Sequence, residues 1–275
     1  MNNIPAKLTD EDYKFHLDLL TSSERRHEEE LRTRITESGL FSFYGSRALI
    51  SNFLAVLSYY LGFPEKSILY GREAVLASHE VFYREWQKVV SSGNHGDERP
   101  SVAYCRRNNA WEICVSAGLL WSSALHEWHA MRVIAEYLRD DPRLDPSLSN
   151  LERAWYIILA GACRGGDWRE LLRWRMLIES SRQQKYCLLL ACLEAMIAGD
   201  SSKAGQGMHE YIELFKSTDF KSENILMVMS LDGSILLNLA KYKGWELPVS
   251  EIARPFLIEF SEEQLTRSCS ENSNL

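Results

Sequence analysis

Two histidines stand three residues apart in the segment His126-Glu127-Trp128-His129, a spacing that would place both on one face of a helix. Two imidazoles on one face can begin a zinc site. The zinc-protease motif is HExxH, however, and this segment reads HExH. A structural zinc site needs four ligands, and the sequence offers no third ligand nearby. We therefore interpret the segment as part of an amphipathic helix, with no metal site, and predict that folding does not depend on a metal ion.

Two aspartates each follow a glycine, in the pairs Gly166-Asp167 and Gly199-Asp200, which lie 33 residues apart. Paired carboxylates can act as general acid and base. Here the context offers a simpler role, because glycine ends a helix by entering the left-handed conformation and the following aspartate can cap the next helix. We interpret both aspartates as helix caps.

The motifs that mark an enzyme are missing from the sequence. It contains no glycine-rich phosphate loop after a strand, no GxSxG and no evident pairing of cysteine with histidine. The six cysteines are scattered without a CxxC pair, and most lie in apolar helical text, where a free thiol packs as a small hydrophobe. We predict a protein that is not an enzyme, with no catalytic residues and no cofactor.

A locally basic segment surrounds the first Gly-Asp pair. Acids at Asp167, Glu170 and Glu179 interleave with its cations, which favours a solvated helix face over a nucleic-acid groove. The formal net charge of -7 also disfavours direct nucleic-acid binding and permits a basic protein partner. The cations are Arg164, Arg169, Arg173, Arg175, Arg182 and Lys185.

The 33-residue interval between the Gly-Asp pairs is typical of tetratricopeptide-type repeats, in which helix pairs stack on one another. Apolar periodicity predicts helices on both sides of each pair, and no segment shows the alternation of a strand. We predict an all-α fold of stacked antiparallel helix pairs, a tetratricopeptide-like helical repeat or bundle. The expected helices of this part cover residues 150–164, 167–180, 182–198 and 200–216.

Further helices are predicted on either side of these. In the first hundred residues they cover 9–37, ended by Gly39, then 46–61, ended by Gly62, and 64–90, begun by Pro64. Residues 102–121 and 124–139 predict two helices meeting at Ser122-Ser123, or one bent helix.

The segment 91–100 holds two glycines and a proline, which are loop signals. It predicts a boundary between an N-terminal helical subdomain, residues 1–95, and a C-terminal helical-repeat subdomain, residues 96–260. A long loop within one solenoid is the alternative. Residues 261–275 are polar and are expected to form a flexible tail.

An aspartate interrupts the most apolar predicted helix, residues 223–243. Asp232 falls in the middle of its stripe of Ile, Val, Met and Leu residues. An unpaired carboxylate is costly to bury. We therefore predict that Asp232 is buried and is paired with a cation or hydrogen-bonded to backbone amides.

Composition sets the broad class. Of 275 residues, 45% are hydrophobic and 25% are charged, as in an ordinary globular protein. The N-terminus has neither the basic nor the apolar region of a signal peptide, and no apolar run reaches the ~18 residues of a membrane span. Together with the unpaired cysteines, this predicts a cytoplasmic protein with no membrane partner.

Three segments carry a resemblance to a known family. They read LAGACRGGDWRELL at residues 159–172, YCLLLACLEAMIAGD at 186–200 and LLNLAKYKGWELPVSEI at 236–252. In these segments the C-terminal two-thirds resembles the immunity-protein family 49 of bacterial polymorphic toxin systems, with a neighbouring resemblance to the immunity proteins of PoNe nuclease toxins. The resemblance implies an antitoxin that binds and blocks a cognate toxin domain, and no catalytic residue carries over from it.

A toxin that acts on nucleic acid would present a basic surface. We therefore expect contacts from acids of the first and third predicted helices, with a tryptophan beside them as an aromatic anchor. The position of this tryptophan, Trp86, in the apolar stripe of its helix favours burial instead. The candidates are Glu28, Glu29, Glu80, Glu85 and Trp86. A helical-repeat scaffold or peptide-sensing regulator, with a peptide groove, stays open as an alternative. So does an all-helical enzyme, with a pocket of convergent polar groups.

Overall fold

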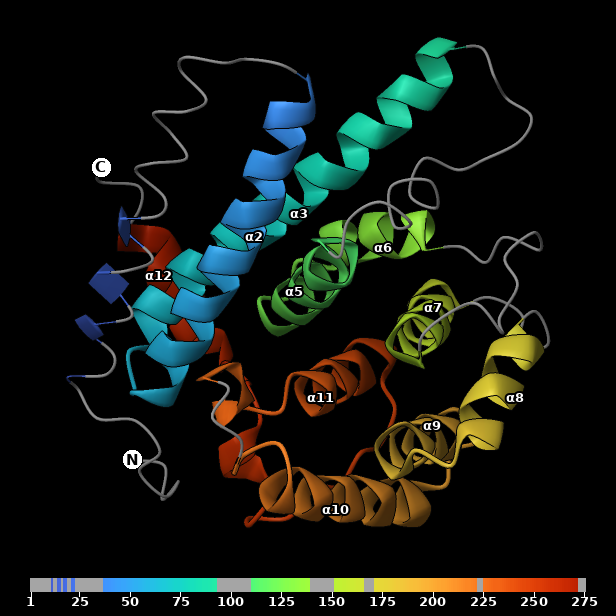
Figure 1. Ribbon diagram of the computed structural model, residues 1–275. Coiled ribbons are helices and arrows are strands. Elements are labelled where there is room, and N and C mark those ends of the chain that lie inside the picture. Colours follow the sequence, from blue (N-terminus) through green and yellow to red (C-terminus); the bar gives the residue numbers. More distant parts are fainter. Residues whose placement is uncertain are drawn as a thin grey trace. The chain divides into compact units, whose positions relative to one another are not determined.

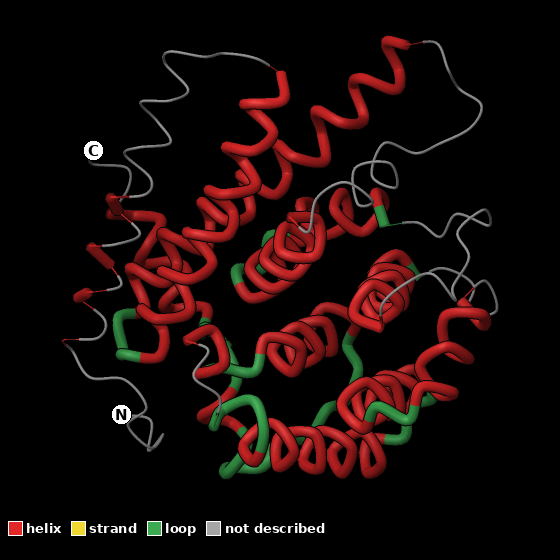
Figure 2. Tube along the Cα trace, viewed as in Figure 1, coloured by secondary structure: helices red, strands yellow, loops and turns green. Residues whose placement is uncertain are grey.

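The computed structural model describes residues 11, 14, 15, 17, 18, 21, 22, 37–92, 110–138, 151–165, 171–221 and 225–271. All regular structure in these residues is helical, and no strand occurs among them (Figure 1, Figure 2). The predicted all-α class is confirmed. Within the same ranges, no helix is long and apolar enough to cross a membrane.

Contacts group the chain into two compact units. Unit 1 comprises residues 1–125 and 260–275, and unit 2 comprises residues 126–259. The boundary expected at residues 95 and 96 lies outside the described ranges. Helix α5 (Ala110–Ala124) packs on the helices that precede this region, which is why unit 1 extends beyond it. The segment expected as a flexible tail contains helix α12 (Glu262–Glu271), which packs on α3.

Unit 1 is built on a helical hairpin of α2 (Glu37–Tyr60) and α3 (Pro64–Ser92). Gly62 ends α2 with φ of +81°, and Pro64 begins α3, as predicted. The expected helix end at Gly39 is wrong, because α2 already begins at Glu37. A glycine inside a helix lowers helix stability by only about 1 kcal/mol relative to alanine, so the helical residues on either side can offset its cost.

Unit 2 contains two stacked helical hairpins. The first joins α7 (Leu151–Arg164) to α8 (Leu172–Ser181), and the second joins α9 (Gln184–Ile197) to α10 (Ser201–Ser217). Contacts of α8 and α7 with α9 hold one hairpin against the other, and α6 (Trp128–Tyr137) packs on α7 (Figure 1). The predicted antiparallel pairs are confirmed, with α7, α9 and α10 beginning and ending within two residues of the expected positions. The start expected for α8 at residue 167 lies outside the described residues.

The turn at Gly199 has the geometry that the sequence predicted. Gly199 has φ of +73°, and the amide of Asp200 donates to the carbonyl of Ala195 at 2.9 Å, closing the end of α9. The carboxylate of Asp200 then accepts from the amide of Lys203 at 3.1 Å and caps α10. At the earlier turn the left-handed residue is Gly165, with φ of +71°, one position before the expected Gly166. Gly166 and Asp167 lie outside the described residues.

The cap at Asp200 gives a pH-dependent prediction. The hydrogen bond from the Lys203 amide, aided by the Lys203 side chain, lowers the pKa of the Asp200 carboxyl. A lowered carboxyl pKa adds stability that is complete above the ordinary value and is lost as pH falls through the folded value. Asp200→Ala should therefore melt below wild type at neutral pH, and the difference should shrink in acid. Asn, a comparable but uncharged cap, is the matched control, and Asp200→Asn should flatten this dependence. A pH-independent gap between wild type and Asp200→Ala would contradict the prediction.

Helix α11 (Leu231–Lys243) is shorter than the helix predicted for residues 223–243. A short 3-10 turn, η3 (Ile225–Val228), precedes it, and the chain is extended at Ser230. The Ser230 hydroxyl accepts from the amide of Gly233 at 3.3 Å, so Ser230 caps a new helix where the apolar text had suggested a continuous one. Every residue from Asp232 to Ala240 is buried.

Candidate functional site

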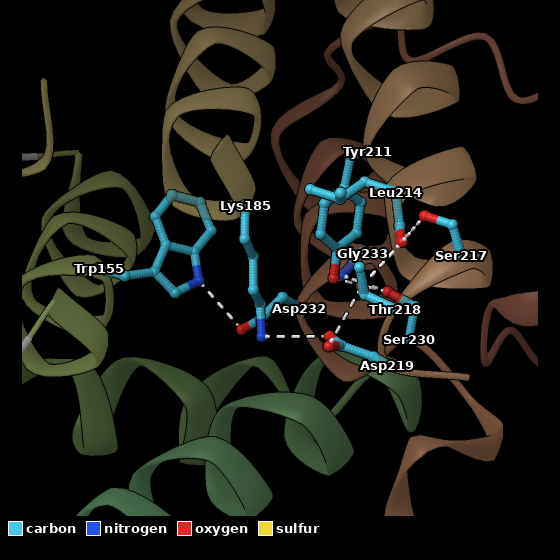
Figure 3. A network of polar contacts seen from close by, with 10 residues as sticks. All are labelled: Trp155, Lys185, Tyr211, Leu214, Ser217, Thr218, Asp219, Ser230, Asp232 and Gly233. Carbon is cyan, nitrogen blue, oxygen red and sulfur yellow. Dashed lines mark hydrogen bonds and ion pairs between the residues drawn. The ribbon is translucent and has the colours of Figure 1, made fainter. Parts of the chain in front are cut away.

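Asp232 lies at the centre of a buried polar network in unit 2 (Figure 3). Its side chain is 9% exposed. The indole Nε1 of Trp155 donates to Asp232 Oδ1 at 3.0 Å, and Lys185 Nζ lies 3.1 Å from Asp232 Oδ2. The predicted burial and cation pairing of Asp232 are confirmed. Its place differs, because it stands in the first turn of α11 rather than mid-helix.

The three partners come from three helices. Trp155 belongs to α7, Lys185 to the first turn of α9, and Asp232 to the first turn of α11. A carboxylate in a first turn is favoured by the helix dipole, whereas a lysine in a first turn is disfavoured. The ion pair to Asp232 offsets this penalty for Lys185, so one carboxylate holds the starts of two helices and the side of a third.

A second layer surrounds the pair. Asp219 Oδ2 lies 3.8 Å from Lys185 Nζ, which also sits 5.4 Å from the centre of the Tyr186 ring. The Ser230 hydroxyl donates to the Tyr211 hydroxyl at 2.9 Å, which joins α10 to the start of α11 (Figure 3). The network therefore contacts α7, α9, α10 and α11 within a single unit.

Electrostatics keep the lysine charged and the tyrosine neutral. The nearby Asp232 carboxylate raises the pKa of Lys185 above its ordinary value, and burial opposes it less strongly. Burial, followed by the charge of Asp232, raises the pKa of the Tyr211 phenol. A protonated amine cannot act as a nucleophile or base. The arrangement holds helices together through charge and hydrogen bonds.

Buried thiols offer no activated nucleophile in the described core. Burial raises the pKa of Cys114, Cys163 and Cys192 to about 12, so all three are protonated at neutral pH. They are free and packed, as expected for cysteines in apolar helical text. Cys192 also donates weakly to the carbonyl of Ala204 across the α9–α10 contact.

The two histidines of the HExH segment do not share a helix face. His126 precedes α6 and is left-handed, with φ of +59°, while His129 is exposed in the first turn of α6. The break between α5 and α6 thus falls at residues 125–127, and Ser122 and Ser123 bond back to carbonyls within α5. Among the described residues, no group of three or more potential ligands could hold a metal ion.

The His126 ring has a different set of neighbours. It stacks on Trp128 with centroids 4.9 Å apart, and Trp128 stacks on Tyr242 of α11 at 4.7 Å. Lys243, the last residue of α11, donates from Nζ to the carbonyl of Cys163 near the end of α7 at 2.8 Å. These contacts join the end of α11 to α6 and α7, as the Asp232 network joins its start to α7, α9 and α10.

Of the predicted partner-contact side chains, the structure describes only one. Glu80 is half-buried on α3. Glu85 and Trp86 belong to the same helix, but their side chains lie outside the described part, as do Glu28 and Glu29 entirely. The contact set therefore stays a prediction.

The chain was compared with protein-family models, curated proteins and solved structures. No match was found. The resemblance to the immunity-protein family 49 therefore rests on the three sequence segments quoted above.

Of the residues in the Asp232 network, only Asp232 itself could be singled out from the sequence. The others come from different helices and follow no local spacing that a sequence motif would reveal.

Proposed function

We propose that this chain is an immunity protein that binds a cognate toxin domain and blocks it by protein-protein contact. The observation that carries the proposal is that the stacked helical hairpins of unit 2 pack against the buried helix α11. Stacked helix pairs offer extended surfaces for partner proteins. The sequence resemblance supplies the class of partner, a toxin domain, with the cytoplasm as the proposed place of action.

Helix α11 makes that surface rigid. It reaches α6 through the Tyr242–Trp128 stack, α7 and α9 through Asp232, and α10 through the Ser230–Tyr211 hydrogen bond. A surface that is already ordered loses less conformational entropy when a partner binds. Inhibitory proteins gain affinity from this kind of preorganisation, which supports binding without chemistry.

The same helix bears on the alternative of a peptide-sensing regulator. That function needs an open groove beside the hairpins. In unit 2, α11 contacts α9 and α10 and is buried from Asp232 to Ala240, so the chain's own helix occupies this space. The observation favours a partner that binds an outer surface.

Charge gives the proposal a kinetic signature. Acids at Glu80 and Glu85 on α3, with Glu28, Glu29 and Trp86, are the proposed contacts for a basic toxin surface. Charge pairs at the rim of an interface mainly accelerate association. Added salt should therefore slow the association rate more than it raises the dissociation rate.

Co-expression tests the proposed function. We expect cells that produce only the protein encoded directly upstream to die, and cells that produce both that protein and this chain to survive. The two proteins should co-purify in a fixed ratio, and mass spectrometry should find the toxin chemically unaltered. Glu80→Lys with Glu85→Lys should weaken protection. Glu210→Lys with Glu213→Lys, on the exposed face of α10, is the matched control. Equal killing with no co-purified complex would refute the proposal.

A further inference from the structure

Three cationic residues gather where helices α6, α7 and α11 end. Lys243, the last residue of α11, donates from Nζ to the carbonyl of Cys163 in the last turn of α7 at 2.8 Å. Arg164, the last residue of α7, donates from its guanidinium to the carbonyl of Ala135 in the last turn of α6. Arg132 lies one turn before Ala135 on α6 and is exposed. We call Arg132, Arg164 and Lys243 the cation cluster.

The helix ends account for two of these cations. A lysine or arginine near a helix C-terminus stabilises the last carbonyl groups, and Lys243 and Arg164 both do this. Arg132 stands in the middle of α6, and it forms no hydrogen bond or ion pair with any described residue. Lys243 likewise has no carboxylate partner within the described ranges. Two cations therefore stand together without an acid, in a chain whose net charge is -7.

Arg132 and Lys243 repel each other. Burial lowers the pKa of the Lys243 ammonium, and the nearby positive charge of Arg132 lowers it further. Like charges held together cost free energy, which a bound anion would offset. The ammonium is also approachable, because its neighbour on one side is the exposed residue Gly165. A Cβ at this position would lie 3.6 Å from Lys243 Nζ, so the glycine leaves this side of the charge uncovered.

We propose that the cation cluster binds a phosphate group, either as free phosphate or as a phosphate monoester. Such a group carries a charge of about -1.5 to -2 at neutral pH, which matches two cations, whereas a carboxylate would leave one of them unneutralised. Arginine offers a planar fork of donors to phosphate oxygens, and lysine adds a point charge.

The affinity should be modest. The negative ends of the helix dipoles oppose an anion, so we expect a Kd on the order of 1 mM. None of these residues belongs to the proposed toxin contacts, so the inference is independent of the proposed function.

Titration of inorganic phosphate, followed by phosphorus NMR at neutral pH and constant ionic strength, tests the site. We expect saturable binding by the full chain. Binding should be roughly tenfold weaker for Arg132→Gln, because a charged hydrogen-bond donor is lost. Lys221→Gln removes an equal charge from another exposed residue of unit 2 and should bind like wild type. Acetate at the same ionic strength should not displace the phosphate.

Stability in the absence of phosphate separates a binding role from a structural one. Arg132→Gln should melt at or slightly above the wild-type temperature, because it removes the repulsion that acts on Lys243. A clear fall in melting temperature would assign Arg132 to the fold and would overturn the inference. So would the absence of saturable phosphate binding by the wild type, equal phosphate binding by Arg132→Gln, or displacement by acetate.

Two further probes distinguish the sources of the phosphate group. O-phosphoserine and adenosine monophosphate are titrated separately against the wild type and Arg132→Gln. Tighter binding of one of them than of inorganic phosphate, with the same loss in Arg132→Gln, supports a phosphorylated protein or a nucleotide respectively. Binding of inorganic phosphate alone, again weakened in Arg132→Gln, supports a site for the free ion.

Discussion

Asp232→Ala is expected to lower the free energy of unfolding by about 3 kcal/mol, measured by urea denaturation. The substitution leaves the Lys185 ammonium without its nearest carboxylate and the Trp155 indole without its acceptor. Lys185 is 31% exposed, so water reaches it partly, and the expected loss lies at the lower end of the values for a broken buried pair. Glu213→Ala, which removes an exposed carboxylate paired with Lys216, should change stability by less than about 0.5 kcal/mol.

Two further variants separate charge from hydrogen bonding at this site. Asp232→Asn keeps an oxygen that accepts from Trp155 but loses the negative charge. Its free energy of unfolding should therefore lie between those of wild type and Asp232→Ala. Lys185→Met leaves a buried carboxylate without its cation and should also destabilise. In the double variant Asp232→Ala with Lys185→Met, part of the two losses should be recovered, because no unpaired charge remains. Strictly additive losses would show that the two side chains do not act as a pair.

The pair should also persist in alkaline solution. Asp232 raises the pKa of Lys185, and a raised lysine pKa adds stability that is fully present below the unfolded value of about 10.4. That stability is lost only as pH rises through the higher folded value. The gap between wild type and Lys185→Met should therefore stay constant from neutral pH to about pH 10.

Several helix ends of this fold follow from glycine. Gly62, Gly199 and Gly244 each adopt positive φ at a helix end, and Gly62 and Gly199 were recognisable from apolar text on one side and a new helix start on the other. Where two glycines adjoin, at Gly165-Gly166, the sequence rule fits either one, and the structure has the left-handed residue at Gly165. His126, with positive φ before α6, was not predicted, because only a few per cent of non-glycine residues adopt positive φ.

The network around Asp232 shows what the sequence leaves open. A carboxylate inside an apolar stripe predicts burial and a partner through the cost of desolvation alone. The identity of the partner depends on which helices come together in space. Lys185 is far from Asp232 along the chain, and the same sequence offers many other cations. The start of α11 was missed for a local reason, because a capping serine at Ser230 was hidden inside continuous apolar text.

Trp121 should be the corresponding anchor of unit 1. Its side chain is fully buried, and its indole Nε1 donates to Asn52 Oδ1 of α2 at 2.7 Å. Its ring covers Gly71 of α3, where an added Cβ would lie 2.7 Å from the ring. Trp121→Ala is expected to cost about 3–5 kcal/mol, the range for truncating a buried aromatic side chain.

Trp121→Phe should cost less than Trp121→Ala. It keeps most of the ring volume but leaves the buried Asn52 amide without its donor, a loss of about 1–3 kcal/mol.

The contact with Gly71 predicts a coupling whose sign can be measured. In the wild type, Gly71→Ala forces a methyl group against a rigid indole and should cost about 1–3 kcal/mol. In the Trp121→Ala background the same methyl group enters the space that the ring vacated, so its cost should disappear or reverse. Thermal or urea unfolding of the four proteins gives the coupling energy directly. An equal cost of Gly71→Ala in both backgrounds would mean that the ring does not hold α3 and α5 together, and that the stability of unit 1 comes from other contacts.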